Sequence, residues 1–257
     1  MRKKAEDHEQ GSVKPTLKIP VSCRIDPSSR LLGQVKVGNH IYIGPNVLIY
    51  SPCEIGEGSY IGANCVIGFP TRAELRSGRE ARSPEDLMKR RRGWVRIGRG
   101  MTIRTNCIIY PEVKLGDEVE LGHNVLLREQ TEIGRCTLIG SNVTVDGKCK
   151  IGSKVSVQTG AYISINTNIE DKAFLGPNCS LLNDLYMKQK AYALRGPTVK
   201  AGASIGGGAV IMPNITVGKG AMVGAGAVVT KDVESGVMVA GVPAKRLKEV
   251  PKRWKIR

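Results

Sequence analysis

The most regular feature of this chain is an aliphatic residue at every sixth position. From Ile97 to Tyr186 the sequence divides into blocks of six that open with Ile, Leu or Val, often with Gly second and a small or β-branched residue fifth. The same register runs from Ile19 to Ile67 and from Val199 to Val229, thirty opening positions in all. Only about a fifth to a quarter of residues in an average protein are aliphatic, so chance does not produce such a row.

A period of six predicts an all-β solenoid. It fits neither the 3.6-residue period of a helix nor the simple alternation of an ordinary strand. We expect one short parallel strand and one bend per block and three blocks per coil, hence about ten coils. At the strand spacing these coils form a prism roughly 45–50 Å long. Each opening side chain points inward and stacks on its equivalent one coil away, and its burial contributes roughly 1.5–3 kcal/mol. Gly and Asn at the bends permit a positive φ.

Two loops interrupt the register. The first spans about 69–95 and holds eight Lys or Arg residues against four acidic ones. A short helix is predicted from Pro84 to Arg92, with Ser83 as its N-cap and acidic residues in its first turn, and Trp94 is expected to anchor the returning chain. Three roles stay open for this loop: cover over a ligand, contact with a neighbouring subunit, or a solvated excursion.

The second loop spans about 187–198 and is preceded by Asn183 and Asp184. A loop that leaves one corner of a solenoid often lines a binding face. Its polar and aromatic residues either contact a sugar or diphosphate or pack the loop onto its own coil; they are Tyr186, Tyr192 and Arg195.

The register also suggests the domain boundaries. We expect residues 1–18 to form a charged, flexible tail, residues 19–234 a single β-helix domain, and residues 235–257 a basic C-terminal cap. A cap is needed because the last coil would otherwise expose an apolar end and unpaired backbone. The first residues, MRKKAEDHEQGS, lack an apolar segment and do not resemble a signal peptide or a membrane span, so a cytoplasmic protein is expected.

Composition narrows the chemistry. Aromatic residues make up 4% of the chain, which suits a narrow core. Six of the seven cysteines occupy the fifth place of a block, where a small inward side chain is needed, and only Cys136 does not. They are expected to be core thiols, consistent with a reducing compartment. The absence of a CxxC pair argues against a zinc site, and no metal is expected.

The net charge of +16 leaves three interpretations open. A basic surface attracts nucleic acid, attracts small polyanions such as coenzyme A or a nucleotide sugar, or is simply a heavily solvated surface. The chain has no nucleic-acid motif and no aromatic stacking platform, so nucleic acid is the least favoured partner.

From about Lys18 to Lys248 the chain resembles the left-handed β-helix hexapeptide acyltransferases. The resemblance is carried by the Ile-Gly block openings, the loop before Gly196 and the ending GAGAVVTKDV…GVPAKRLK. It is greatest to acetyltransferases that act on amino or hydroxyl groups of nucleotide-linked sugars. It implies a left-handed coil, against the usual right-handed crossover. It also implies a homotrimer with active sites between subunits, and acetyl-CoA or another acyl-CoA as co-substrate.

Acyl transfer needs a base for the attacking amine or hydroxyl and donors for the oxyanion. Of the three histidines, His123 in LGHNV matches the family stretch that carries the base, and its alternative role is that of a polar bend residue. Glu129 is the nearest carboxylate in sequence that could orient the imidazole. His40 also lies at a bend, far from the usual site. Some members acting on aminosugars have no obvious side-chain base, and His123 would then only shape the pocket. The substrate-binding residues expected with His123 are Asn124, Arg128, Glu129, Asn183 and Asp184.

The donor site carries over from the family to the C-terminal coils. Small residues in GASIGGGAV and GAGAVV would let a pantetheine arm lie against the backbone, and basic residues nearby would contact its phosphates. The cofactor-binding set is Gly207, Ala209, Ala225, Gly226, Thr230, Lys231, Lys245 and Arg246. For the small residues the alternative is structural, because tight coils need Gly and Ala in any case.

Other functions built on this fold fit less well. A zinc carbonic anhydrase needs three histidines, two of them close in sequence, and this chain has no such pair. A nucleotidyltransferase needs an N-terminal nucleotide-binding domain, for which only about eighteen residues precede the first coil. A non-catalytic scaffold remains the principal alternative to an acyltransferase.

Overall fold

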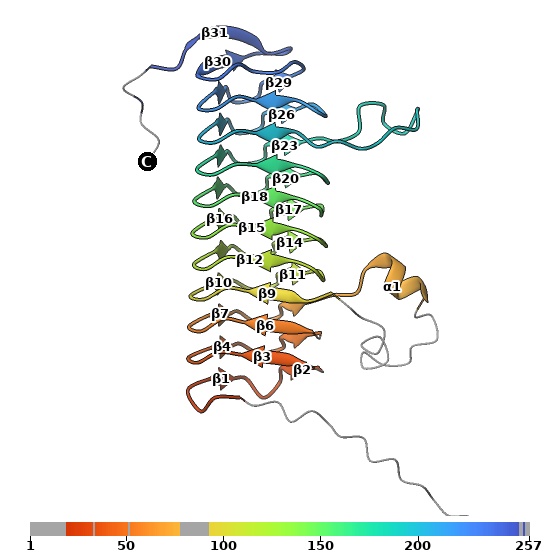
Figure 1. The fold of residues 1–257 in the computed structure, drawn as a ribbon, viewed down its shortest axis with the longest axis vertical. Coiled ribbons are helices and arrows are strands. Elements are labelled where there is room, and N and C mark those ends of the chain that lie inside the picture. Colours follow the sequence, from red (N-terminus) through yellow and green to blue (C-terminus); the bar gives the residue numbers. More distant parts are fainter. Residues whose placement is uncertain (1–18, 33, 51, 78–92, 252–253, 255–257) are drawn as a thin grey trace, which may run out of the picture.

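Three parallel sheets, here called A, B and C, form the sides of a long three-sided rod (Figure 1). The computed structural model describes residues 19–32, 34–50, 52–77, 93–251 and 254. Over these the chain winds through about 11 turns of a parallel β-helix, which confirms the all-β solenoid predicted from the register.

Most coils contribute one two-residue strand to each sheet. Sheet A contains β1 (Arg24–Ile25), β4 (Tyr42–Ile43), β7 (Tyr60–Ile61), β10 (Thr102–Ile103), β13 (Glu120–Leu121), β16 (Leu138–Ile139), β19 (Ser156–Val157), β22 (Phe174–Leu175), β25 (Ser204–Ile205), β28 (Met222–Val223), β30 (Val237–Ala240) and β31 (Lys245–Glu249). Sheet B contains β2 (Arg30–Leu31), β5 (Leu48–Ile49), β8 (Val66–Ile67), β11 (Ile108–Ile109), β14 (Leu126–Leu127), β17 (Thr144–Val145), β20 (Tyr162–Ile163), β23 (Ser180–Leu181), β26 (Val210–Ile211) and β29 (Val228–Val229). Sheet C contains β3 (Val35–Val37), β6 (Cys53–Ile55), β9 (Val95–Ile97), β12 (Lys114–Leu115), β15 (Glu132–Ile133), β18 (Lys150–Ile151), β21 (Asn168–Ile169), β24 (Thr198–Val199) and β27 (Thr216–Val217).

The helix is left-handed, as the family resemblance implied. In Figure 1 the chain rises from β1 to β30, and the strands of sheet C cross the front of the rod from right to left as it rises. Up to β26, each strand pairs in parallel with the strand three places later, as β10 does with β13 and β13 with β16. The three bends of each coil therefore stack into three long edges, which we call the A–B, B–C and C–A edges after the sheets they join.

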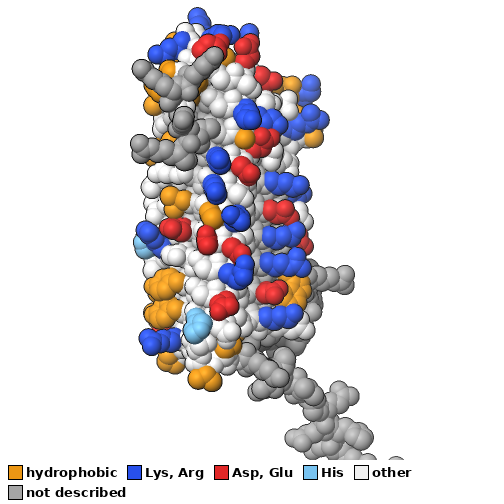
Figure 2. All heavy atoms as spheres, turned by 60° about the vertical axis from the view of Figure 1, so that its left-hand side comes forward, with side chains coloured by type: hydrophobic (Ala, Val, Ile, Leu, Met, Phe, Trp, Pro, Cys, Tyr) orange, Lys and Arg blue, Asp and Glu red, His pale blue; other side chains and the backbone are white. Residues whose placement is uncertain are grey.

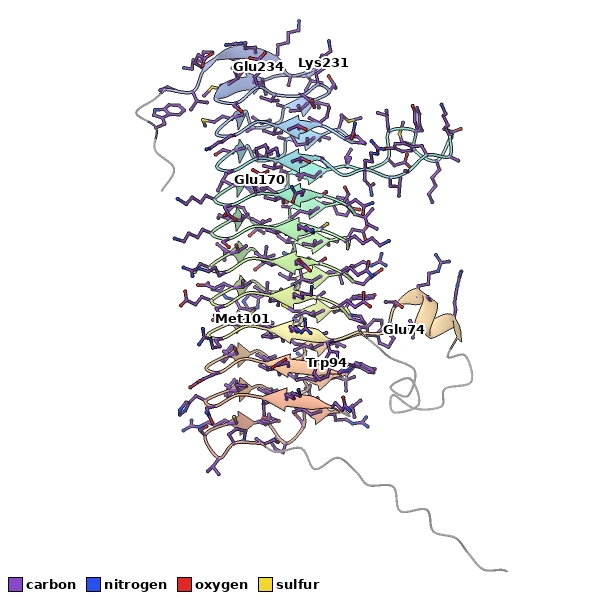
Figure 3. The ribbon with its side chains drawn as sticks, viewed as in Figure 1. Glu74, Trp94, Met101, Glu170, Lys231 and Glu234 are labelled. Atoms are coloured by element: carbon purple, nitrogen blue, oxygen red, sulfur yellow. The ribbon has the colours of Figure 1, made fainter. Side chains whose placement is uncertain are left out.

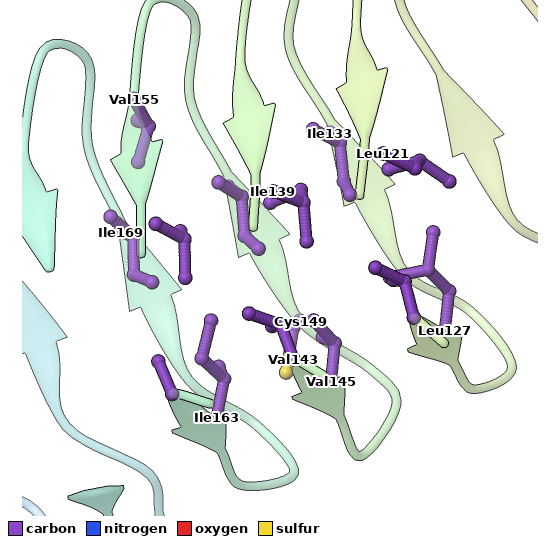
Figure 4. Packing of buried hydrophobic residues seen from close by; sticks show 14 of the residues in the cluster. Leu121, Leu127, Ile133, Ile139, Val143, Val145, Cys149, Val155, Ile163 and Ile169 are labelled. Atoms are coloured by element: carbon purple, nitrogen blue, oxygen red, sulfur yellow. The ribbon is translucent and has the colours of Figure 1, made fainter. Parts of the chain in front are cut away.

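The aliphatic row fills the interior. Leu121 from sheet A, Leu127 from sheet B and Ile133 from sheet C converge on the axis, and each is at most 3% exposed (Figure 4). One opening position departs from the prediction. Ile19 is 43% exposed and precedes the first strand, so the coils begin with Ile25 and not at residue 19.

The bends explain the spacing of Asn and Gly. Asn124 and Asn142 both have φ near +57°, with values of 56° and 57°, a conformation that Asn tolerates better than most residues. Gly122, by contrast, is required by close approach: a Cβ atom there would lie 2.4 Å from the backbone nitrogen of Ser141 in the next coil.

Both loops leave the rod at the B–C edge and project on the same side (Figure 1). The first begins with α1 (Arg72–Ser77), a helix that the sequence analysis did not place there. The helix predicted from Pro84 to Arg92 lies outside the described residues. On its return, the chain places the indole ring of Trp94 against Lys36, whose Nζ is 5.1 Å from the centre of the ring.

The C-terminal boundary of the β-helix requires a correction. We expected the coil to end near residue 234, but β30 pairs in parallel with β28, and Val233 forms a parallel bridge to Val217. The final coil is two residues shorter than the others, which is why the sixfold register fades while the helix continues. The antiparallel strand β31 then covers β30 and closes this end of the rod.

The outer faces differ in character. Along sheet C the outward residues carry charges of both signs, visible as a column of blue and red side chains in Figure 2; they include Lys36, Glu54, Arg96, Lys114, Glu132 and Lys150. Sheet B presents no charged residue at the corresponding positions of β5 to β29. These are Leu48, Val66, Ile108, Leu126, Thr144, Tyr162, Ser180, Val210 and Val228.

Five of the seven cysteines are buried, and all seven are thiols; Cys23 and Cys136 are half-buried. Burial raises the pKa of Cys149 and of Cys179 to about 12. A thiol in such surroundings stays protonated and packs as a small apolar side chain. The buried members thus have the packing role that the register predicted.

Candidate functional site

His123 lies on the A–B edge, in the bend between β13 and β14. Its ring is exposed, and Nδ1 is 2.8 Å from Oγ1 of Thr105, which occupies the same bend one coil below. Its backbone N–H donates to Oγ of Ser141 one coil above, at 3.0 Å. The hydroxyl of Thr105 engages Nδ1, and Nε2 is the nitrogen left to act on a ligand.

The predicted partnership between His123 and Glu129 is not found within the chain. Glu129 lies on the B–C edge, across the whole width of sheet B, and its Oε1 is 2.7 Å from Nη2 of Arg128. Thr105 therefore takes the orienting role that was expected of Glu129. Sequence reasoning missed it because the two residues are 18 positions apart, which is one full coil.

Asn124 belongs to a ladder of amide side chains on the A–B edge. Its Nδ2 donates to Oδ1 of Asn142 at 3.0 Å, and Asn46 donates to Asn64 in the same way at 3.3 Å. The positive φ of Asn124 turns the chain at this bend. Its position next to His123 keeps it near any ligand there, while its amide already has a structural partner.

Arg128 is the centre of a charged cluster on the B–C edge. It binds Glu129 and also Asp146, whose Oδ1 is 3.1 Å from Nη1, and its guanidinium carbon lies 5.5 Å from the centre of the Tyr110 ring. Partial burial lowers the pKa of Arg128, but the hydrogen bonds and charges of the two carboxylates outweigh it and hold the pKa above its ordinary value. The sequence analysis named Arg128 and Glu129 but not Asp146, which lies 18 residues after Arg128.

Tyr162 extends this cluster onto the outer face of sheet B. Its hydroxyl donates to Oδ2 of Asp146 at 3.4 Å. Burial raises the pKa of Tyr162, and the negative charge of Asp146 raises it further. The phenol is therefore a hydrogen-bond donor at neutral pH, directed at the same carboxylate that holds Arg128.

Asn183 and Asp184 organise the second loop. The backbone oxygen of Asn183 accepts a hydrogen bond from the hydroxyl of Tyr192 at 2.7 Å. The carboxylate of Asp184 accepts from the backbone N–H groups of Tyr186 and Lys188, each at 3.0 Å. These groups hold the loop in shape. The loop stands on the B–C edge, and within one chain it is separated from His123 by sheet B.

The predicted donor-binding residues fall into separate places. Gly207, Ala225 and Gly226 lie on the A–B edge, in line with His123 and several coils above it, where the N–H of Gly226 donates to the oxygen of Gly207 at 2.9 Å. This part of the edge consists of Gly and Ala residues, so a ligand can approach the backbone. Ala209 is fully buried in the core and faces away from that surface.

The basic members of the donor set lie elsewhere. Thr230 and Lys231 are exposed at the B–C edge. Lys245 and Arg246 are on β31, and Arg246 is bound by Glu234 at 3.1 Å and by Glu249 (Figure 3). One chain therefore does not gather the full predicted set around a single cavity.

The described residues contain neither a metal-binding cluster nor a membrane-spanning helix. No group of three or more His, Cys, Asp or Glu side chains in this part of the chain is placed to hold a metal ion. No helix there is both long enough and apolar enough to cross a membrane.

Comparison with known proteins gives the class of the repeat. Residues 34–68 and 196–231 match the family described as "Bacterial transferase hexapeptide (six repeats)". Both segments are therefore hexapeptide repeats of this family, which confirms the resemblance seen in the sequence. No curated protein matches the chain.

Solved structures with a similar course of the chain include three acyltransferases. LpxA from Acinetobacter baumannii is 19% identical, with 90% of this chain and 73% of that chain covered and a TM-score of 0.46. UDP-N-acetylglucosamine acyltransferase from Campylobacter jejuni is 15% identical, with 88% and 75% covered and a TM-score of 0.48. A hexapeptide-repeat-containing acetyltransferase from Vibrio cholerae, complexed with acetyl coenzyme A, is 23% identical, with 47% and 71% covered and a TM-score of 0.40.

Proposed function

We propose that this protein is an acyltransferase. It moves an acyl group, most simply acetyl, from acyl-CoA to an amino or hydroxyl group of a sugar linked to a nucleotide. The observation that carries the proposal is the placement of His123 on an open edge of a transferase-type β-helix. Its Nδ1 is held by Thr105, and several coils above it the same edge is built from Gly and Ala, at residues 206–209 and 224–227.

The chemistry follows from this arrangement. With Nδ1–H donating to Thr105, Nε2 of His123 accepts the proton from the attacking amine or hydroxyl. The freed lone pair forms a bond to the thioester carbonyl, whose electrons move to oxygen. Collapse of that tetrahedral species breaks the carbon–sulfur bond, and coenzyme A leaves as a thiolate that takes back the proton from His123.

We further propose that the active assembly is a homotrimer with sheet B facing the threefold axis. From β5 to β29 the outward strand residues of sheet B are uncharged, in contrast to the mixed positive and negative residues of sheet C. Association removes an uncharged face from water at a lower cost than a charged one. In a closed threefold ring, an interface joins two different patches, one on each neighbour.

This arrangement would also bring together the site residues that one chain places on two different edges. A prism that turns one face to the axis meets its neighbours along the two edges of that face. The A–B edge of one subunit, with His123, would then lie against the B–C edge of the next, with Arg128 and both loops. His123 and Arg128 flank the same strand, β14, so they would meet at the same height along the axis.

The proposal places the protein in the cytoplasm, where acyl-CoA is available and cysteines stay reduced. The principal alternative is a non-catalytic scaffold of the same shape. Consumption of acetyl-CoA against a panel of nucleotide-linked aminosugars and sugars separates the two. We expect turnover with at least one acceptor, and a loss of about a hundredfold or more in the His123→Ala variant with unchanged thermal unfolding. No turnover together with no thermal stabilisation by coenzyme A would favour the scaffold.

A further inference from the structure

A basic hollow lies between α1 and the B–C edge. Its volume is about 450 Å³. Four cationic side chains and one carboxylate line it, and they are Arg72, Arg76, Arg128, Lys148 and Glu129. Of these cations, the sequence analysis assigned only Arg128 to a binding site.

The start of α1 is fixed by a reciprocal pair of hydrogen bonds. The backbone N–H of Thr71 donates to Oε2 of Glu74 at 2.7 Å, and the N–H of Glu74 donates to Oγ1 of Thr71 at 3.3 Å (Figure 3). This capping box sets where the helix begins. Arg72 and Arg76 are then four residues apart, one turn along a single face of the helix, and both line the hollow.

Among the described residues, the positive charges that line the hollow outnumber the carboxylates. Arg128 is satisfied by Glu129 and Asp146. Within the part of the chain that the structure describes, no carboxylate is ion-paired with Arg72, Arg76 or Lys148. Lys148 is held at the rim by a bend with φ of 48°, whose N–H donates to the oxygen of Glu129. Three cations around one small volume attract a compact dianion, and the planar arginine fork matches a phosphate group.

From Arg72, Arg76 and Lys148 we infer that this hollow binds a phosphate or diphosphate group of a substrate. The inference rests on the proposed function, because both substrates proposed there carry such groups. The nucleotide-linked acceptor would bring its diphosphate here, at the level of His123 and Arg128. Coenzyme A is the other source, and it would have to extend down from the small residues near Gly207.

A direct test uses inorganic pyrophosphate as the probe and does not depend on any turnover. Isothermal titration at low salt should give a pyrophosphate affinity about tenfold or more weaker in the double variant Arg72→Gln/Arg76→Gln than in the wild-type protein. The matched control is Arg135→Gln/Lys154→Gln, which removes the same charge from exposed positions in adjacent coils of the C–A edge. Its affinity should match the wild type. Equal weakening in both variants, or no binding to the wild type, would overturn the inference.

Kinetics then identify the source of the phosphate. With an acceptor found in the panel above, a higher KM for that acceptor alone in the Arg72→Gln/Arg76→Gln variant assigns the hollow to the acceptor. A higher KM for acyl-CoA alone assigns it to coenzyme A. Unchanged values of both would overturn the inference. If no acceptor is turned over, the proposed function fails. The pyrophosphate titration still shows in that case whether the hollow binds a diphosphate.

Discussion

Nδ1 of His123 lies 2.8 Å from Oγ1 of Thr105, one coil below it on the same edge of the rod. The contact joins two residues 18 positions apart and engages Nδ1 of the imidazole, not Nε2. In the proposed mechanism this contact holds the imidazole in one orientation.

Replacement of Thr105 by Val should therefore lower turnover while the β-helix stays intact. Loss of one net hydrogen bond of about 1 kcal/mol corresponds to a decrease in kcat of about fivefold. Thr105→Ser keeps the hydroxyl and should restore most of the rate. Steady-state kinetics of the two variants, with KM for acyl-CoA measured alongside, check this. A Val variant as active as the wild type would remove Thr105 from the mechanism.

A second prediction concerns the small residues several coils above His123 on the A–B edge. Ala225 is exposed on the A–B edge, and Ala225→Trp should fill the space proposed for the pantetheine arm, so that KM for acetyl-CoA rises by about tenfold or more. Ala63 occupies the same place of its block, between Gly62 and Asn64, near the other end of that edge. Ala63→Trp is therefore the matched control. If both variants have wild-type KM values, the donor does not bind along these coils.

The uncharged face of sheet B predicts the effect of a single charge on assembly. Thr144 lies outward on sheet B between Leu126 and Tyr162, and Thr144→Glu should place an unpaired carboxylate in the proposed trimer interface and shift the protein towards monomers. Thr198 has the corresponding place on the polar sheet C, and Thr198→Glu should leave the assembly unchanged. Size-exclusion chromatography with light scattering measures both. A monomeric wild type, or a trimeric Thr144→Glu protein, would contradict the interface.

The pH dependence of stability should include Glu170, which joins the coil before the second loop to the coil after it. A hydrogen bond from Lys200 at 2.8 Å, and a second from the N–H of Ala201, hold the pKa of Glu170 below its ordinary value of 4.5. A pKa that is lower in the folded than in the unfolded state gives stability that is present above the unfolded value. That stability is lost as the pH falls through the pKa of the carboxyl group in the folded state.

Wild-type protein should consequently lose thermal stability on acidification below about pH 4.5, and Glu170→Gln should lose less over the same range. Lys200→Met, which removes the partner of the carboxylate, should flatten the profile in the same direction. Unfolding midpoints measured between neutral and acidic pH provide the comparison. An identical slope in all three proteins would mean that this pair does not contribute.

The sequence alone determined the architecture, because the sixfold aliphatic period is a local pattern that only stacked bends and short strands can bury. From it followed the three-sided rod, the inward places of Cys107 and Cys149, and the loops near residues 69–95 and 187–198. The period failed only at its ends, at Ile19 and beyond residue 234, where a neighbouring coil on one side is missing or shortened.

The tertiary structure decided which residues share an edge. Neighbours across a coil are 18 positions apart, so Thr105 joins His123 and Asp146 joins Arg128, while Glu129, only six residues after His123, is carried across sheet B to another edge. Closeness along the chain misleads in a solenoid because each bend turns the next residues onto a new face. The basic hollow depended on a further fact beyond the repeat, namely where α1 begins and which side of it faces the rod.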